Sequence, residues 1–514
     1  MKLRREENYR DKQLIEIMIP SPISIIDVSS FDGCENLEEI TFLSNSNLEH
    51  IGKNAFRNCK KLRKIILPDS VKTIGNSAFD GCINIETIIL GKNIVYIGED
   101  AFKNCKKLKS ITIPNGIKRV SCFRGCNSLQ SIRIPDSVEE IGDFAFEKCY
   151  ELQMVDMGNN IRRIGNFAFN RCVKITFVLL FGNLKSIGNF AFARCKSLLS
   201  MIIPDSVEKI GFHCFSGCIE LTNIRLSLNL KKIGICCFSG CKKLSGLHIP
   251  DSVLDIGMNA FSRCSSIEHI HIPDSVCAIG IRAFSGCEKL KLAVLSENIR
   301  NINIGLFCGC FELESVRIGP NIQGIYRYAF YCCKLKNLQM DDSDSIIIPE
   351  NIGFIGLSAF YNCRMKKLVI ESKTIISDNS FISCENLKSA SIGENAVLHG
   401  DYIFLLCKNL QYLSIGSNVE ICGNNIFEQS VKFVNIGENF INPLNYFENI
   451  QNYYGTFKSL QKYNFLDVKT CPISHDDFED DTEVILTSCG HLFSKEYFDL
   501  CIDKLRCPMC RAVY

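Results

Sequence analysis

The sequence predicts a repeat solenoid of short parallel strands joined by helical turns, about 18 coils long, with a small α+β module at its C-terminal end. A pattern of a small residue, Phe, two variable residues and Cys recurs along most of the chain, mostly at intervals of 23 residues. The same apolar alternation precedes these cysteines, and the period stops after Gly437. The repeated cysteines, termed slot cysteines, stand at positions 34, 59, 82, 105, 126, 149, 172, 195, 218, 241, 264, 287, 310, 333, 363, 384 and 407.

The repeat from Leu129 to Cys149 shows why each strand is expected. Ile132 and Ile134 alternate with polar residues, which is typical of a short strand with one buried face. Residues 135–137 (Pro-Asp-Ser) are turn formers, because proline presets φ and the Asp and Ser side chains bond nearby backbone. Residues 138–141 (Val-Glu-Glu-Ile) predict a second short strand.

The end of the unit is expected to reverse the chain. Gly142 permits a tight bend, and residues 145–149 (Ala-Phe-Glu-Lys-Cys) fit a single helical turn with Phe146 and Cys149 on one side. No single repeat can bury its apolar face alone, so stacked repeats are expected to share one continuous core.

Two repeats depart from the pattern most clearly. The interval from Cys333 to Cys363 is longer, and residues 341–345 mark the expected insertion. An eighteenth unit has Ser430 in the cysteine slot, which shows that a thiol is not required there.

The 30 cysteines would suggest disulfides in a secreted protein. Residues 1–13 are charged and lack the apolar centre of a secretory signal, so we expect an intracellular protein. In a reducing compartment a cysteine beside a core phenylalanine packs as a small hydrophobic residue. The slot cysteines are therefore expected to be structural, and the pairs 236–237 and 332–333 to combine one core thiol with one edge neighbour.

Charge and composition argue against several classes of function. A net charge of +2 gives no reason to expect a nucleic-acid or membrane partner, and no apolar run approaches the roughly 20 residues that span a bilayer. Hydrophobic residues make up 46% of the chain, so it can bury a core. Frequent Ile, Asn and Lys with no Trp indicate an AT-rich genome, such as that of a protist or of a giant virus of amoebae. A viral origin would place the protein in the host cytoplasm.

Unit after unit matches the signature L-x-x-I-x-I-P-x-x-V-x-x-I-G-x-x-A-F-x-x-C. This repeat resembles the BspA-like class of leucine-rich repeats, and the resemblance covers roughly residues 20–437. It implies a solenoid of leucine-rich repeat type with parallel strand ladders, preceded by an N-terminal cap over residues 1–19.

The middle residue of each I-x-I strand is expected to face outward, where an unknown target protein could bind. These positions are Thr112, Arg133, Asp156, Leu179, Ile202, Arg225, His248, His271, Val294 and Arg317. The target-binding candidates are Arg133, Arg225, His248, His271 and Arg317. The central and later part of the row is cationic or titratable, with Arg225, His248 and His271 on consecutive coils, which would favour an acidic partner. The alternative is that polar side chains merely face water. His248 and His271 would be a poor metal site, since no third ligand is evident beside them.

After Gly437 we expect a C-terminal cap and connector over residues 438–466 and a separate module over residues 467–514. The module contains Cys489-Gly-His491 and Cys507-Pro-Met-Cys510. Two cysteines from one turn, with a Cys and a His from another, suit tetrahedral zinc, and we expect one zinc per chain. A module with few apolar residues gains folding energy from such a metal. The alternative is that these are ordinary buried thiols.

The order Cys471-Pro-Ile, Cys489-x-His491, a helical segment and Cys507-Pro-x-Cys510-Arg511 resembles the RING and U-box superfamily of ubiquitin-ligase domains. The resemblance implies two cross-braced sites. The second, complete site comprises Cys489, His491, Cys507 and Cys510. The first site would comprise Cys471, Ser474, Ser494 and Tyr497. Only Cys471 is a good ligand in that first site, so the pattern is most similar to the one-zinc SP-RING domains of SUMO ligases. A first site rescued by His475 and Cys501 is the alternative.

The resemblance also assigns contacts to a ubiquitin-conjugating enzyme charged with ubiquitin. The positions that form the groove for that enzyme are matched by Ile473, Phe498, Cys501 and Pro508. Arg511 matches the linchpin arginine, which would orient the thioester-linked ubiquitin for attack without a covalent intermediate on the ligase. Cys501 stands where related domains often carry Trp, which shrinks the contact surface. The alternative for Ile473 and Phe498 is a place in the core of the module.

These expectations combine into a ubiquitin-protein ligase in which the solenoid binds the target and the tail recruits the conjugating enzyme. One alternative is a non-enzymatic interaction scaffold whose tail is a zinc-stabilised cap or dimer contact. The other is a SUMO ligase, which the one-zinc pattern favours, although the flanking elements of SUMO ligases are not evident.

Overall fold

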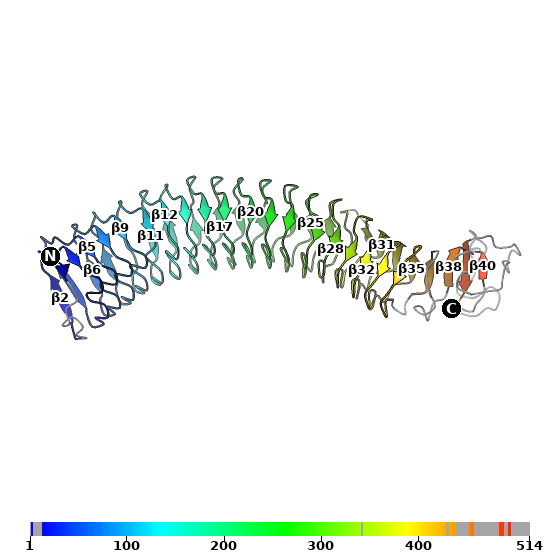
Figure 1. The fold of residues 1–514 in the computed structure, drawn as a ribbon, viewed down its shortest axis with the longest axis horizontal. Helices are drawn as coiled ribbons and strands as arrows, with labels where there is room; N and C mark the ends of the chain where they lie inside the picture. Colours follow the sequence, from blue (N-terminus) through cyan, green and yellow to red (C-terminus); the bar gives the residue numbers. More distant parts are fainter. Residues whose placement is uncertain are drawn as a thin grey trace. The chain divides into compact units, whose positions relative to one another are not determined.

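The structure is a computed structural model, and it describes residues 2–3, 13–340, 343–427, 431–437, 452–456, 483–487 and 492–494. The chain falls into two compact units, divided between Ile267 and Glu268. In both units the chain winds through successive coils (Figure 1). Each regular coil contributes a first strand, a turn, a second strand and a corner that ends at the slot cysteine.

Strands of successive coils pair in parallel, which gives each unit a first ladder, made of first strands, and a second ladder, made of second strands. In the first unit, the first strands are β2 (Glu16–Ile19), β4 (Glu39–Phe42), β6 (Lys64–Ile66), β8 (Thr87–Ile89), β11 (Ser131–Arg133), β13 (Met154–Asp156), β15 (Phe177–Val178), β17 (Ser200–Ile202), β19 (Asn223–Arg225) and β21 (Gly246–Leu247). The second strands are β1 (Lys2–Leu3), β3 (Ile25–Ile26), β5 (His50–Ile51), β7 (Thr73–Ile74), β9 (Tyr96–Ile97), β10 (Arg119–Val120), β12 (Glu140–Ile141), β14 (Arg163–Ile164), β16 (Ser186–Ile187), β18 (Lys209–Ile210), β20 (Lys232–Ile233) and β22 (Asp255–Ile256).

The second unit repeats this plan. Its first strands are β23 (His269–His271), β25 (Leu292–Val294), β27 (Ser315–Arg317), β29 (Ser345–Ile348), β31 (Lys367–Ser372), β33 (Ser389–Glu394), β35 (Tyr412–Ile415) and β37 (Phe433–Ile436). Its second strands are β24 (Ala278–Ile279), β26 (Asn301–Ile302), β28 (Gly324–Ile325), β30 (Phe354–Ile355), β32 (Ile375–Ile376), β34 (Val397–Leu398) and β36 (Glu420–Ile421).

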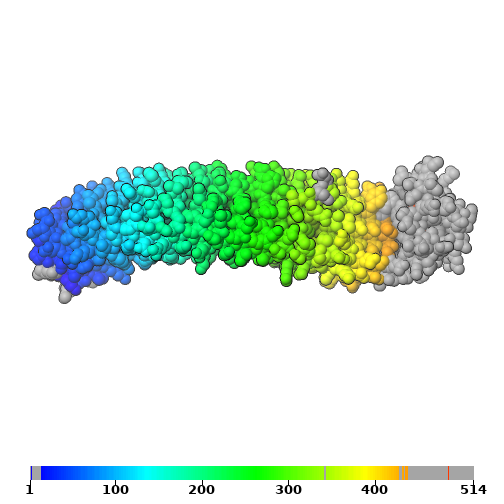
Figure 2. Space-filling model, turned by 90° about the horizontal axis from the view of Figure 1, so that it is seen from above, coloured from blue at the N-terminus to red at the C-terminus, as the bar shows by residue number. Residues whose placement is uncertain are grey.

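Pairing joins residues one repeat apart, so equivalent side chains stack on one another. Ile132 pairs with Val155 and Val155 with Val178, and all three side chains are buried. The predicted alternation is confirmed, because Ile132 and Ile134 are buried whereas Arg133 between them is exposed. Within each unit the space-filling view shows segments following one another in sequence order, as expected when each coil packs on its neighbours (Figure 2).

The corner is where the prediction was wrong, because the described part of the chain contains no helix. Around Phe146 the corner is a run of tight turns, in which Glu147 N donates to Phe144 O at 3.0 Å and Cys149 N to Phe146 O at 3.1 Å. The amides of Phe146 and Lys148 donate instead to the next coil, to Ala168 O at 2.7 Å and Asn170 O at 2.8 Å. Phe144 and Lys148 adopt left-handed φ values of 57° and 63°, and these residues interrupt the right-handed path of a helix. The residue before every slot cysteine has a positive φ.

The buried phenylalanines of the corners form a stack along each unit. In the first unit the distances between neighbouring ring centroids run from 5.0 Å (Phe31–Phe56) to 5.7 Å (Phe102–Phe123). Each slot thiol for which a bond is resolved contacts the carbonyl of the phenylalanine one coil earlier. For example, Cys172 Sγ lies 3.1 Å from Phe146 O. The slot cysteines are therefore buried core residues, as expected, and they are hydrogen-bond donors as well.

In many coils a glycine follows the second strand, and close approach of the neighbouring coil explains it better than an unusual φ does. Gly142 was expected to permit a tight bend, yet its φ is not positive, and a Cβ there would lie 2.6 Å from Ser121 Cβ. A Cβ on Gly188 would lie 2.5 Å from the carbonyl carbon of Gly165. At Gly188 the neighbouring coils thus pack backbone against backbone.

Beyond β37 the first ladder of the second unit continues into the tail. Strand β38 (Asn452–Thr456) pairs in parallel with β37, β39 (Glu483–Thr487) antiparallel with β38, and β40 (Leu492–Ser494) antiparallel with β39. Strand β38 falls in the predicted cap and connector, and β39 and β40 fall in the predicted module. At the N-terminal end, β1 and β2 fall in the predicted cap of residues 1–19 and pair with β3 and β4.

The glycine packing leads to a stability prediction with a matched control. Gly188→Ala is expected to lower the free energy of unfolding by about 1–3 kcal/mol, since the new methyl overlaps backbone that cannot move aside. Gly182→Ala is the control, because a Cβ there meets nothing within 4 Å and should change stability by less than about 0.5 kcal/mol. Urea unfolding followed by circular dichroism measures both. Equal stability of the two variants would contradict the close-approach explanation.

Candidate protein-interaction surface

The first ladder presents the row of outward side chains that the sequence predicted. Nine of the ten predicted positions are exposed, and the tenth, Val294, is half-buried. The five target-binding candidates are all exposed. Arg133, Arg225 and His248 belong to the first unit, and His271 and Arg317 belong to the second.

The arginines of this row are less available to an acidic partner than the sequence indicated. Arg225 Nη2 lies 2.7 Å from Asp205 Oδ2, and Arg133 Nε lies 3.5 Å from Asp156 Oδ2. In the second unit Arg317 Nη2 lies 3.8 Å from Glu297 Oε1. Each arginine therefore already has a carboxylate partner, which offsets its charge.

The first ladder also carries a group of exposed apolar side chains that sequence reasoning did not single out. This group, termed the apolar strand patch, comprises Met154, Phe177, Leu179, Leu199 and Ile202. Their exposed fractions lie between 46% and 63%. Met154 and Phe177 are directly paired neighbours on β13 and β15, so the patch extends over consecutive coils. Leu179 and Ile202 were named only as outward positions; their apolar character was the signal that could have marked the patch.

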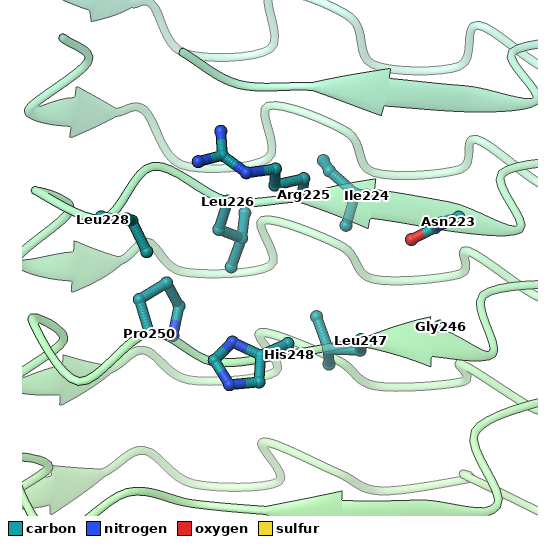
Figure 3. A pocket seen from close by; sticks show the side chains of 9 residues that line it. All are labelled: Asn223, Ile224, Arg225, Leu226, Leu228, Gly246, Leu247, His248 and Pro250. Atoms are coloured by element: carbon teal, nitrogen blue, oxygen red, sulfur yellow. The ribbon is translucent and has the colours of Figure 1, made fainter. Parts of the chain in front are cut away.

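A groove of about 450 Å³ lies on the same ladder between β19 and β21. Its lining comprises Asn223, Ile224, Arg225, Leu226, Leu228, Gly246, Leu247, His248 and Pro250 (Figure 3). Gly246 pairs with Asn223 and has no side chain to fill the space beside it. The guanidinium of Arg225 points away from His248, toward its partner Asp205 on the preceding coil (Figure 3). The groove therefore combines apolar walls with one imidazole, His248, at its edge.

The thiols in the described part of the chain are all free, with no disulfide. Burial raises the pKa of the slot thiol Cys218 to about 12, so this cysteine stays protonated and unreactive at neutral pH. In the two adjacent pairs, Cys237 and Cys333 are buried whereas Cys236 and Cys332 are half-buried. This confirms the predicted combination of a core thiol and an edge neighbour.

The predicted residues of the tail lie outside the described residues. These are the ligands Cys471, Cys489, His491, Cys507 and Cys510, the contact residues Ile473, Phe498, Cys501 and Pro508, and the linchpin Arg511. Among the residues that the structure does describe, no cluster of three or more His, Cys, Asp or Glu could hold a metal ion. The same part of the chain has no helix that is long and apolar enough to cross a membrane.

Comparison with known proteins agrees with this architecture. The model of the BspA type leucine-rich repeat region matches residues 4–122, 119–222, 208–336 and 339–434. No curated protein matches the chain significantly. The last match ends at residue 434, so the comparisons give no support to a RING- or U-box-like module in the tail.

Solved structures of leucine-rich repeat proteins are similar to the chain. A leucine-rich repeat protein from Bacteroides ovatus is 27% identical, with a TM-score of 0.51, over 65% of this chain and 94% of that one. A leucine-rich cell surface protein from Faecalibacterium prausnitzii is 23% identical, with a TM-score of 0.36, over 74% of this chain and 87% of that one. With family matches across most of its length, the chain belongs to the BspA-type leucine-rich repeat family.

Proposed function

We propose that the chain is a protein-interaction scaffold that binds its target through the first ladder of the first unit. The observation that supports this most directly is the apolar strand patch. Five large apolar side chains about half exposed on consecutive coils are costly to leave in water, and contiguous apolar areas on soluble proteins commonly mark interaction sites.

The neighbouring groove supplies a place for an anchor. Its apolar walls suit one buried side chain of a partner, and such anchors dominate the binding energy of protein interfaces. Arg225 is already paired with Asp205. The surface therefore favours an apolar, uncharged contact over the acidic target that was predicted from the arginines and histidines of the row.

The patch can be tested by introducing charge into it. Leu179→Asp combined with Ile202→Asp is expected to weaken target binding at least about tenfold, since two carboxylates would have to be desolvated in the interface. The measurement is quantitative mass spectrometry of proteins that co-purify with the full chain from its own cells.

Ile89→Asp is the matched control, because Ile89 is an exposed isoleucine on the same ladder, on β8, outside the patch. Partners retained by the control and lost from the double variant would support the proposal. A set of partners unchanged by the double variant would contradict it.

A second candidate function, ubiquitin ligation by the tail, rests on the ligand motif in the sequence, set beside the pairing of two described strands. Strands β39 and β40 form an antiparallel hairpin in which Leu486 pairs with Leu492. In the sequence, Cys489 and His491 lie in the short connection between these strands. The spacing of these two residues in the sequence, with one residue between them, suits two ligands of one zinc ion. We propose that Cys507 and Cys510 complete this site and that Arg511 positions ubiquitin on a conjugating enzyme.

Metal content and ligase activity can be measured separately. The full chain is expected to hold one zinc by mass spectrometry and to speed ubiquitin discharge from at least one conjugating enzyme to free lysine. Arg511→Ala should lower discharge at least about tenfold and leave the zinc content unchanged, because Arg511 is not a ligand.

Two outcomes would refute parts of this second candidate. Loss of zinc from the Arg511→Ala variant would contradict the proposal that this arginine positions ubiquitin and does not contribute to the zinc site. A zinc-loaded protein without discharge across a panel of ubiquitin and SUMO conjugating enzymes would leave the interaction scaffold as the whole function.

A further inference from the structure

The corners of the first unit carry a second row of surface side chains, distinct from the first ladder. Phe144, Phe167, Phe190 and His213 stack face to face, with ring centroids 5.0, 4.7 and 4.5 Å apart. Phe212 meets Phe190 edge to face at 5.6 Å. Phe212 and, on the next corner, Ile235 are exposed. An apolar strip therefore runs along the surface of consecutive corners.

The second ladder borders this strip. Its outward position in β14 is Arg163, which reaches Asp143 on the preceding corner with an Nη2–Oδ1 distance of 2.9 Å. Two repeats further on, the counterparts of Arg163 and Asp143 are Lys209 and Asn189, and Asn189 Oδ1 accepts a hydrogen bond from Phe212 N at 3.0 Å. Side chains of the second ladder and of the corners therefore share one surface.

Cations without an ion pair lie on the coils that carry the strip. Lys185, Lys209, Lys231 and Arg194 are exposed, and none has an ion pair in the described part of the chain. By contrast, Lys232 is paired with Asp255 at 2.6 Å. The four successive corners 166–171, 189–194, 212–217 and 235–240 contain no Asp or Glu. Glu208, directly before β18, is the one carboxylate in or next to the second strands between Lys185 and Lys232, and it stands one repeat from both Lys185 and Lys231.

We propose that this surface, termed the basic corner and comprising Lys185, Arg194, Lys209, Phe212, Lys231 and Ile235, docks an acidic segment of a partner protein that also carries apolar side chains. Charge complementarity selects the acidic groups, and the exposed Phe212 and Ile235 contact the apolar ones. Because the surface repeats from coil to coil, it suits a segment that lies along several coils.

The stacked rings of the strip are poorly suited to nucleic-acid bases. Both faces of Phe167 and of Phe190 are covered by neighbouring rings, so neither ring offers an open face on which a base could stack. At the other end of the stack, the guanidinium of Arg124 lies 4.7 Å from the centroid of Phe144. Burial also lowers the pKa of His213, so at neutral pH His213 contributes a neutral ring to the strip.

The test uses the full chain and a fluorescein-labelled peptide of about 15 residues in which Glu alternates with Leu and Phe. Fluorescence anisotropy should show binding that weakens with added salt. A peptide with every Glu replaced by Gln should bind at least about tenfold more weakly. Lys209→Glu combined with Lys231→Glu should cost about tenfold in affinity, and Phe212→Ser several-fold.

Lys196→Glu combined with Lys242→Glu is the matched control. It makes the same change in net charge, at exposed lysines that directly follow the slot cysteines Cys195 and Cys241. The control, and the Leu179→Asp, Ile202→Asp variant of the first ladder, should both retain the affinity of the unmodified chain. Circular dichroism confirms that each variant is folded.

Three results would overturn the proposal: an equal loss of affinity in the lysine control, equal binding of the Gln peptide, or no binding of the Glu peptide. Phosphatidylserine vesicles and single-stranded RNA are the competing probes. Tighter binding to either than to the Glu peptide, lost in Lys209→Glu with Lys231→Glu, would also overturn the assignment to a protein partner.

Discussion

In each regular corner the carbonyl of the buried phenylalanine accepts hydrogen bonds from two directions. Phe146 O receives the amide of Cys149 at 3.1 Å within its own turn and the thiol of Cys172 at 3.1 Å from the next coil. The first bond closes the turn and the second joins two coils, so one oxygen sets both the shape of the corner and the spacing of the stack. As a result, the centroids of neighbouring phenylalanine rings lie 5.0–5.7 Å apart in the first unit. Outward side chains that are one repeat apart in the sequence form rows along the surface.

Those rows give the first unit two surfaces of different chemistry. On the first ladder Arg133 and Arg225 pair with Asp156 and Asp205, so the exposed Met154, Phe177, Leu179, Leu199 and Ile202 dominate. On the basic corner, Lys185, Lys209 and Lys231 have no such partner in the described part of the chain. A scaffold with one apolar surface and one basic surface could hold two partners at once, because stacked repeats offer more than one long binding surface.

The repeat period, the alternation of the strands and the outward row could be predicted because they depend on local pattern alone. The corner could not: Lys148, Arg171 and Arg194 adopt positive φ, and a long basic side chain gives no signal of that conformation. The ion pairs of Arg225 and Arg133 could not be predicted from the local pattern either, because each carboxylate partner lies about one repeat away in the sequence. The zinc ligands and contact residues of the tail rest on a motif outside the described residues, so they stay predictions.

The most direct test of this account is the stability of Cys172→Ser compared with Cys172→Ala, measured by urea unfolding of the full chain. Serine retains a donor for the carbonyl of Phe146, whereas alanine removes it and differs little in size. The account predicts that the serine variant has the higher free energy of unfolding, by about 1 kcal/mol, the usual net value of a hydrogen bond. If alanine is as stable as serine or more stable, the slot cysteine acts by packing alone, and the bond from coil to coil does not hold the stack together.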